Sequence, residues 1–141
     1  MTPRHGSTRF GRRAGRGAAL IEDALAFLVF AVLAAGIMEL GLAGAIANTV
    51  SFAAQRAARY ASVNGSASGH AATVSAIQGI AQQYAAPFNG AALTTSVSWS
   101  PDNNPGSAVT VTVGYALTPA LLPISSTGFT LHATASHRII Q

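Results

Sequence analysis

Residues 18–47 read AALIEDALAFLVFAVLAAGIMELGLAGAIA, and this stretch decides the fold because it holds the longest apolar run of the chain. Residues 24–38 carry no charge, Glu39 interrupts the run, and residues 40–47 add eight more uncharged positions. These 24 positions form a helix of about 36 Å, whereas the apolar core of a bilayer is about 30 Å thick. The sequence therefore predicts a transmembrane helix, which we place at residues 18–48.

The composition of the whole chain fits one domain with an apolar anchor. The chain has 141 residues, of which 50% are apolar and 9% are charged, against about 25% charged residues in ordinary soluble domains. Disorder over the whole chain is excluded, because disorder requires low hydrophobicity and high charge. The absence of cysteine excludes a disulfide scaffold, thiolate zinc sites and cysteine nucleophiles.

Positive charge is concentrated in a leader, residues 1–17, which is rich in arginine and glycine and is predicted to be irregular. From Ala18 onward three arginines face four acids, a net charge of −1, which argues against nucleic-acid binding. The arginines favour a cytoplasmic N-terminus for the following span; a targeting or nucleic-acid-binding role is the alternative. The leader arginines are Arg4, Arg9, Arg12, Arg13 and Arg16.

The helix is expected to continue beyond the membrane. Residues 48–63 lack proline and glycine and are rich in helix-forming residues. Their apolar members recur every three or four positions, at Val50, Ala53, Ala54, Ala57, Ala58 and Ala61. Residues 64–69 (NGSASG) predict the end of this helix, residues 71–84 a second helix and residues 85–92 a loop.

The last third of the chain changes to strand periodicity. Apolar and polar residues alternate before and after residues 101–106 (PDNNPG), which predict a turn, and again after a proline-containing loop at residues 117–128. The alternating apolar residues are Val97, Trp99, Val109, Val111, Val113, Tyr115, Phe129, Leu131, Ala133 and Ala135. We predict an α+β fold in which two helices cover one face of a three-stranded antiparallel meander, with the domain at residues 49–141.

Residues 12–27 (RRAGRGAALIEDALAF) place a glycine, Gly17, between the basic leader and the apolar run, with Glu22 five residues later. This arrangement resembles the processing site of type IV prepilins. The resemblance implies that prepilin peptidase cuts between Gly17 and Ala18 on the cytoplasmic side, and that Glu22 pairs with the free N-terminal amine of a neighbouring subunit. A carboxylate near a bilayer is costly unless it is paired, and an ammonium group is a matched partner.

The resemblance extends to the TadE-like pseudopilins of the tight-adherence (Flp) pilus. Residues 36–41 (GIMELG) and 53–63 (AAQRAARYASV) are similar to two helix segments of that family, the second containing Arg56, Arg59 and Tyr60. The family often has phenylalanine where this chain has Asp23 and arginine where it has Leu42.

Membership of this family implies a minor pseudopilin or assembly component that serves adhesion or secretion and is the substrate of an enzyme rather than an enzyme. Its partners would be prepilin peptidase, other pilins and pseudopilins, pilus assembly proteins and membrane lipid. The chain would cross the inner membrane once, with a cytoplasmic N-terminus and an extracytoplasmic domain, and could enter the extracellular pilus.

Two features of the sequence allow more than one interpretation. Glu39 is a mid-helix acid that either reaches water at the outer interface of the membrane or packs against other subunits. Arg56 and Arg59, one helical turn apart, either form a solvated helix face or contact a partner.

No catalytic, cofactor-binding or metal-binding group is predicted. None of the four histidines has metal-ligand spacing to an acid or another histidine, and His132 and His137 are expected on opposite faces of one strand. Two other functions remain open. The first is an uncut, membrane-anchored binding domain with a pocket lined by Trp99, Tyr115 and Phe129. The second is a soluble protein released by cleavage after Ala47.

Overall fold

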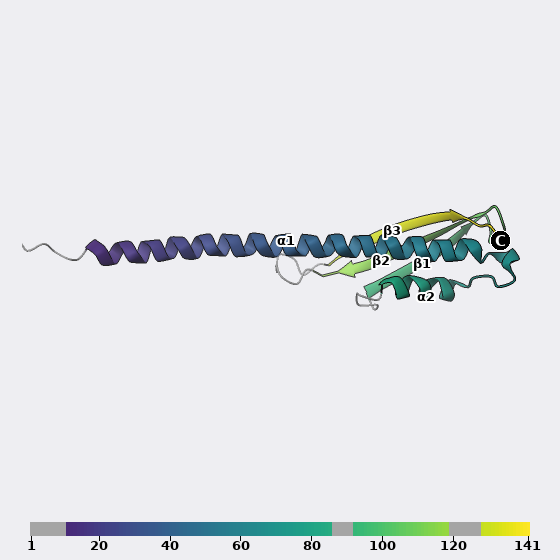
Figure 1. The fold of residues 1–141 in the computed structure, drawn as a ribbon, viewed down its shortest axis with the longest axis horizontal. Helices are drawn as coiled ribbons and strands as arrows, with labels where there is room; N and C mark the ends of the chain where they lie inside the picture. Colours follow the sequence, from purple (N-terminus) through teal and green to yellow (C-terminus); the bar gives the residue numbers. More distant parts are fainter. Residues whose placement is uncertain (1–10, 86–91, 119–127) are drawn as a thin grey trace, which may run out of the picture. The chain divides into compact units, whose positions relative to one another are not determined.

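A computed structural model describes the backbone of residues 11–85, 92–118 and 128–141, and the side chains of these residues from Gly17 onward. It has the predicted α+β layout of a long apolar helix, a second helix and a three-stranded antiparallel sheet (Figure 1). The elements in chain order are α1 (Gly11–Val63), a short 3₁₀ turn (Ser66–Ser68), α2 (Val74–Ala85), β1 (Leu93–Ser100), β2 (Ala108–Leu117) and β3 (Phe129–Arg138).

Helix α1 begins earlier than the sequence predicts. The whole of residues 1–17 was expected to be irregular, but residues 11–17 are helical; residues 1–10 lie outside the described part. Arginine and alanine are good helix formers. A turn added to an existing helix needs no new nucleation, which offsets the cost of about 1 kcal/mol for each glycine. At its other end α1 continues to Val63, as predicted.

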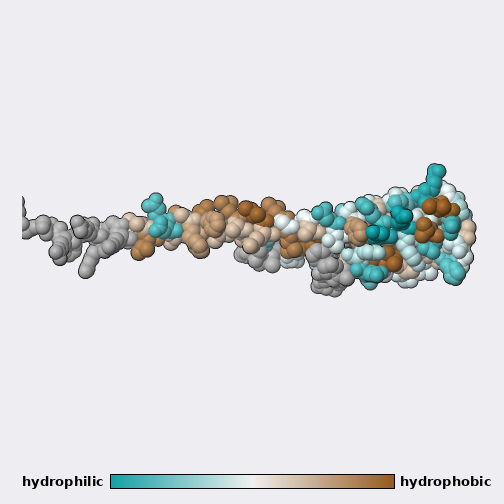
Figure 2. Space-filling model, viewed as in Figure 1, coloured by the Kyte–Doolittle hydropathy of each residue, from teal (hydrophilic) through white to brown (hydrophobic). Residues whose placement is uncertain are grey.

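The chain divides into two compact units, residues 1–38 and 39–141, and α1 contributes to both. In the first unit its large apolar side chains are exposed on all sides of the helix, and Figure 2 shows this part of α1 mostly in brown and tan, with a hydrophilic patch in teal near its N-terminal end. Within the described residues, α1 is the helix with the length and apolar composition to cross a membrane. The exposed large apolar residues of this unit are Leu20, Ile21, Leu25, Phe27, Leu28, Val29, Phe30, Val32, Leu33, Ile37 and Met38.

The second unit buries one face of α1. All six residues of the predicted apolar stripe are buried, and the stripe begins one turn earlier, at Ile46. Five of the seven apolar residues buried on this face are alanine. Core packing therefore starts two residues before the predicted end of the transmembrane span.

The sheet is the predicted meander, with the strand order β1-β2-β3 and antiparallel pairing throughout. Val111 of β2 pairs with Val97 on one side and Ala135 on the other, which places the odd-numbered residues of all three strands on one face. Both helices contribute to the core on that face, α1 through its alanines and α2 through Ile77 and Ala81. The opposite face carries serine and threonine hydroxyls. The prediction that the helices cover the apolar face is confirmed.

Helix α2 begins at Val74, three residues after the predicted start. The hydroxyl oxygen of Thr73 accepts a hydrogen bond from the backbone N–H of Ala76 at 3.2 Å. Thr73 is therefore the N-cap residue, and a capping threonine has non-helical backbone angles. The helix cannot extend back to Ala71 while this cap is in place.

Gly65 lies where the end of α1 meets the C-terminal tail. The backbone N–H of Ile140 donates to the carbonyl oxygen of Ser62 at 2.9 Å, which holds the tail against this corner. A Cβ atom at Gly65 would overlap the backbone oxygen of Gln141 and the side chain of Ile139. Because Ile139 is itself buried, the side chain has little room to move.

We expect Gly65→Ala to destabilise the domain by about 1–3 kcal/mol through overpacking. The backbone of Gly65 is extended, with φ −75°, so the effect is steric and does not arise from the backbone angles. Thermal unfolding of the purified chain measures it, with Gly79→Ala as the control, because the surroundings of Gly79 are open. Equal melting temperatures for Gly65→Ala and the native chain would contradict this packing.

Asp102 organises the turn between β1 and β2. Its Oδ1 accepts hydrogen bonds from the Ser107 hydroxyl at 2.6 Å and from the Asn104 backbone N–H at 3.0 Å. These hydrogen bonds hold the pKa of the Asp102 carboxyl below its ordinary value of 3.8, and the hydrogen bond from Ser107 has the largest effect. A carboxyl with a lowered folded-state pKa stabilises the fold above its unfolded-state pKa, and this contribution is lost as the pH falls through the folded-state pKa.

We therefore expect the melting temperature to fall as the pH drops below about 4, with a shallower fall in Asp102→Asn. At pH 7 the same variant should be slightly less stable than the native chain, because a charged acceptor has been replaced. Melting curves recorded between about pH 2 and pH 7 test this. Parallel pH profiles for the two chains would show that Asp102 contributes nothing to acid stability.

Candidate functional site

Gly17 and Ala18, the residues of the predicted processing site, lie on α1 and are exposed to solvent. Among the described residues, and apart from the adjoining backbone of its own helix, no atom lies within 4 Å of the place that a Cβ atom at Gly17 would occupy. The surroundings of the peptide bond are thus open to a second protein. Because the backbone is helical here, cleavage in an extended conformation requires this end of α1 to unwind, and glycine lowers that cost by about 1 kcal/mol.

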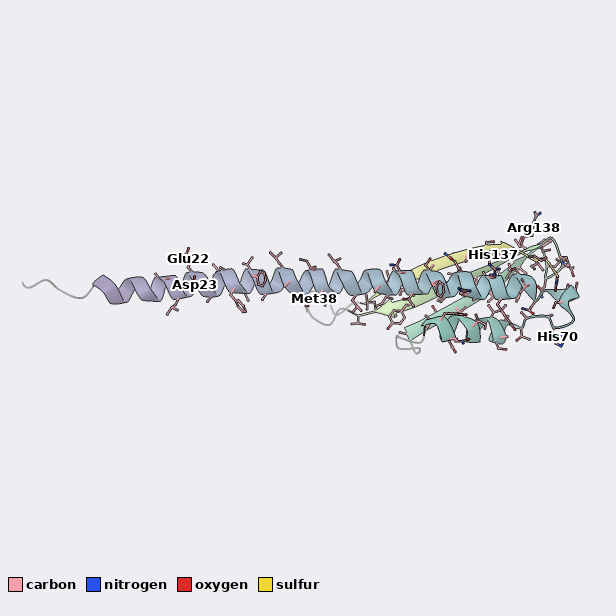
Figure 3. The ribbon with its side chains drawn as sticks, viewed as in Figure 1. Glu22, Asp23, Met38, His70, His137 and Arg138 are labelled. Carbon is pink, nitrogen blue, oxygen red and sulfur yellow. The ribbon has the colours of Figure 1, made fainter. Side chains whose placement is uncertain are left out.

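Glu22 and Asp23 are both exposed on α1 (Figure 3). Successive residues of an α-helix are about 100° apart around its axis, so the two carboxylates face different directions. A single positively charged neighbour therefore cannot pair with both carboxylates in the same geometry. Glu39, the mid-helix acid, is partly buried and is the first residue of the second unit.

The segment with Arg56, Arg59 and Tyr60 divides between two sides of α1. Both arginines are exposed, whereas Tyr60 is partly buried and packs against the hydrophobic core. The three residues therefore do not form one site. Tyr60 contributes to the packing of the domain, and the arginines are available to a partner.

Arg56 is held in place by two aromatic rings. Its guanidinium carbon lies 4.8 Å from the ring centroid of Phe52 and 5.6 Å from that of Tyr84. The two rings meet edge to face, with centroids 5.4 Å apart and an interplanar angle of 84°. Cation–π contacts of this kind are worth about 0.5–1 kcal/mol at an exposed site. Tyr84 belongs to α2, so these contacts join the two helices.

A shallow hollow of about 250 Å³ lies beside Arg56 and is lined by Phe52, Gln55, Arg56, Arg59 and His137. No pattern in the sequence connects His137 or Tyr84 with the arginines. Phe52 could have been found from its position one turn before Arg56. His137 stands opposite Val109 in the register of β2 and β3 and so faces the helices, whereas Arg138 lies on the other face of the strand (Figure 3).

The aromatic pocket expected for a membrane-anchored binding domain does not form, and this prediction is wrong. Trp99 pairs with Val109, six residues along β2 from Tyr115, and Phe129 pairs with Leu117. Six residues of a strand span about 20 Å. Trp99 therefore lies at one end of the sheet, while Tyr115 and Phe129 lie at the other.

Three of the four histidines, His70, His132 and His137, lie in the part of the chain that the structure describes. The register places His132 and His137 on opposite faces of β3, as predicted. Among the residues that the structure describes, no group of three or more histidines and acids is placed to hold a metal ion.

Comparison with protein-family models, with curated proteins and with solved structures finds no match to this chain.

Proposed function

We propose that this protein is a pseudopilin of the TadE-like kind, a minor component or assembly factor of a tight-adherence pilus that serves adhesion or secretion. In this proposal prepilin peptidase removes residues 1–17, and α1 anchors the mature chain in the inner membrane with its N-terminus towards the cytoplasm. The α+β domain then lies outside the cytoplasm, where it meets other pilins and pilus assembly proteins. The protein is a structural component rather than an enzyme.

The observation that carries this proposal is the exposed apolar half of α1. Leu20, Phe27 and Ile37 are each about 70% exposed (69%, 69% and 71%), although burial of such side chains is favourable by about 1.5–3 kcal/mol each. An apolar surface of this extent requires lipid or neighbouring helices as cover. In this proposal lipid covers the surface before assembly and other subunits cover it afterwards.

The start of the domain supports this proposal over secretion by cleavage after Ala47. Ile46 is 2% exposed and belongs to the hydrophobic core. Cleavage after Ala47 would remove this side chain and cut α1 within a continuous helix. Cleavage after Gly17 leaves the domain intact.

The intact mass of the protein isolated from membranes tests the proposal. We expect a chain that begins Ala18-Ala19-Leu20-Ile21-Glu22. A chain that keeps residues 1–17, or one that starts at Asn48, would overturn the proposal. A reporter fused after Gln141 should be active outside the cytoplasm, because the leader arginines favour a cytoplasmic N-terminus.

Glu22→Ala should separate processing from assembly. Glu22 lies five residues inside the mature chain, so we expect cleavage to proceed but the amount of assembled protein to fall by about tenfold or more. The reason is that a neighbouring amine loses its carboxylate partner in a poorly solvated place. Intact mass measures cleavage, and recovery in the sheared pilus fraction or the assembly complex measures assembly. Normal assembly of Glu22→Ala would contradict the role given to this carboxylate.

A further inference from the structure

The hollow beside Arg56 has the shape and the hydrogen-bond donors to hold a carboxylate. Arg56 and Arg59 line it together with Gln55 and His137. A guanidinium group can bind a carboxylate through two parallel N–H donors, and the amide of Gln55 and the ring of His137 carry further donors. The hollow therefore suits an anion that has two oxygens in one plane.

The two aromatic rings that hold Arg56 are themselves open to a partner. Phe52 is 44% exposed and Tyr84 is 37% exposed, and both rings lie against the guanidinium group. Because Arg56 is already ordered, it loses less side-chain freedom on binding a ligand than a free arginine would. Arginine and tyrosine are also enriched among the residues that contribute most to protein–protein binding. This surface thus combines a positioned cation with apolar ring edges.

A carboxylate bound in the hollow belongs to another molecule. The chain has four acidic side chains, all in the part that the structure describes. Three are on α1, and the nearest of them, Glu39, precedes Arg56 by 17 positions, which is about 25 Å along the helix. The fourth, Asp102, is held in the β1–β2 turn by Ser107 and Asn104 and does not line the hollow.

We propose that the hollow binds an acidic side chain of a partner protein. The partner's carboxylate lies on Arg56 and Arg59, and an apolar residue next to it contacts Phe52 and Tyr84. The location of this partner rests on the proposed function, under which the domain meets other pilus components outside the cytoplasm. The charges are complementary, because residues 40–141 contain three arginines and a single acid.

An anionic membrane surface fits the hollow less well than a protein does. Attraction to such a surface takes clusters of about four to eight basic residues, whereas two arginines line the hollow. The paired donors and the exposed rings instead match one carboxylate with an apolar neighbour.

The arginine side chains make this site measurable by NMR, because the chain from Ala18 onward has three of them. In the full chain isolated from membranes and isotope-labelled at arginine, a peptide of alternating glutamate and leucine should shift the Nε–H signals of Arg56 and Arg59 until they saturate. Arg138, on the other face of β3, should not respond. A peptide with glutamine in place of glutamate should shift none of them. No shift with the glutamate peptide, or equal shifts of all three arginines, would overturn the site.

Substitution of the arginines gives a second measurement. Arg59→Gln leaves the ring contacts of Arg56 in place and should weaken binding of the glutamate peptide by about tenfold or more. Arg56→Lys keeps the charge but loses the paired donors, and should also weaken binding. Arg138→Gln is the matched control and should bind as the native chain does, and melting temperatures check that each variant is folded. Native affinity in both hollow variants, or an equal loss in the control, would overturn the proposal.

Nanodiscs of defined lipid separate the protein ligand from a lipid phosphate. The signals of Arg56 and Arg59 should be the same in phosphatidylglycerol and phosphatidylcholine discs, and the glutamate peptide should shift them in both. If phosphatidylglycerol alone shifts them and the peptide then has no effect, the ligand is a lipid headgroup and the partner protein is wrong.

The carboxylate site and the proposed function fail in different ways. If the chain keeps residues 1–17 in membranes, the pseudopilin function is wrong, whatever the peptide does. If the chain is cut at Gly17 and assembles while the peptide shifts neither Arg56 nor Arg59, the pseudopilin function stands and the carboxylate site is wrong.

Discussion

Gly17→Val is expected to leave the full-length chain in the membrane, with the rate of leader removal reduced by about a hundredfold or more. A peptidase must hold the residue before the cut in an extended conformation, and a displacement of about 1 Å at the reacting bond costs this much. The added side chain would meet none of the described residues outside the adjoining backbone of α1, because none of their atoms lies within 4 Å of the Cβ position. The loss would therefore report on the peptidase cleft rather than on folding.

Intact mass and the melting temperature together measure this result. Gly41→Val is the matched control, since Gly41 also lies on α1 in open surroundings and is far from the cut. The control should lose residues 1–17 as the native chain does, and both variants should keep the native melting temperature. If the leader is removed normally from Gly17→Val, Gly17 is not required for processing and the proposed cleavage site is wrong.

Ile77→Ala is expected to destabilise the domain by about 2–5 kcal/mol, the range for large-to-small substitutions in a core. Ile77 is fully buried on α2 and belongs to the core that joins both helices to the sheet. In a domain of about 100 residues each kcal/mol lowers the melting temperature by about 4–8 °C. The fall should therefore exceed about 8 °C.

The single tryptophan, Trp99, offers a probe for this measurement, because it is half-buried against the core on β1. Its fluorescence can be followed during thermal unfolding of the full chain in detergent. Gln82→Ala is the matched control, since Gln82 is exposed on the same helix and alanine preserves helix propensity. A similar melting temperature for both variants would mean that α2 does not cover the sheet.

Most of the fold could be predicted because its signals are local. The three strands follow an alternation that sets each side chain on one face, and the turn at residues 101–106 brings two of them together. The alanine stripe of α1 gives the buried face by its spacing alone. The start of α1 was missed because a glycine-rich, arginine-rich leader favours disorder when considered alone. Its connection to a long helix removes the cost of nucleating a new helix, so residues 11–17 become helical.

The candidate site could be predicted only in part. Gly17, Glu22 and the arginine segment were found from their order along the chain and from resemblance to a family. The hollow was not, because Tyr84 and His137 approach Arg56 and Arg59 from elements distant in sequence. No local pattern reports such a contact. The expected pocket of Trp99, Tyr115 and Phe129 does not form for a related reason. The type of a residue does not show which residues lie level with it on the neighbouring strands.

The alanine face of α1 has a consequence for side-chain entropy. Burial of a leucine or methionine fixes rotamers at a cost of about 0.5–2 kcal/mol, whereas alanine has no rotamer to fix. Burial of the alanine positions in the core therefore costs little conformational freedom beyond that of forming the helix. The same property means that the five alanine positions of this face have no side chain that can adjust. A larger residue at Ala57 or Ala58 cannot rearrange into a free space, and the spacing between α1 and the sheet must change instead.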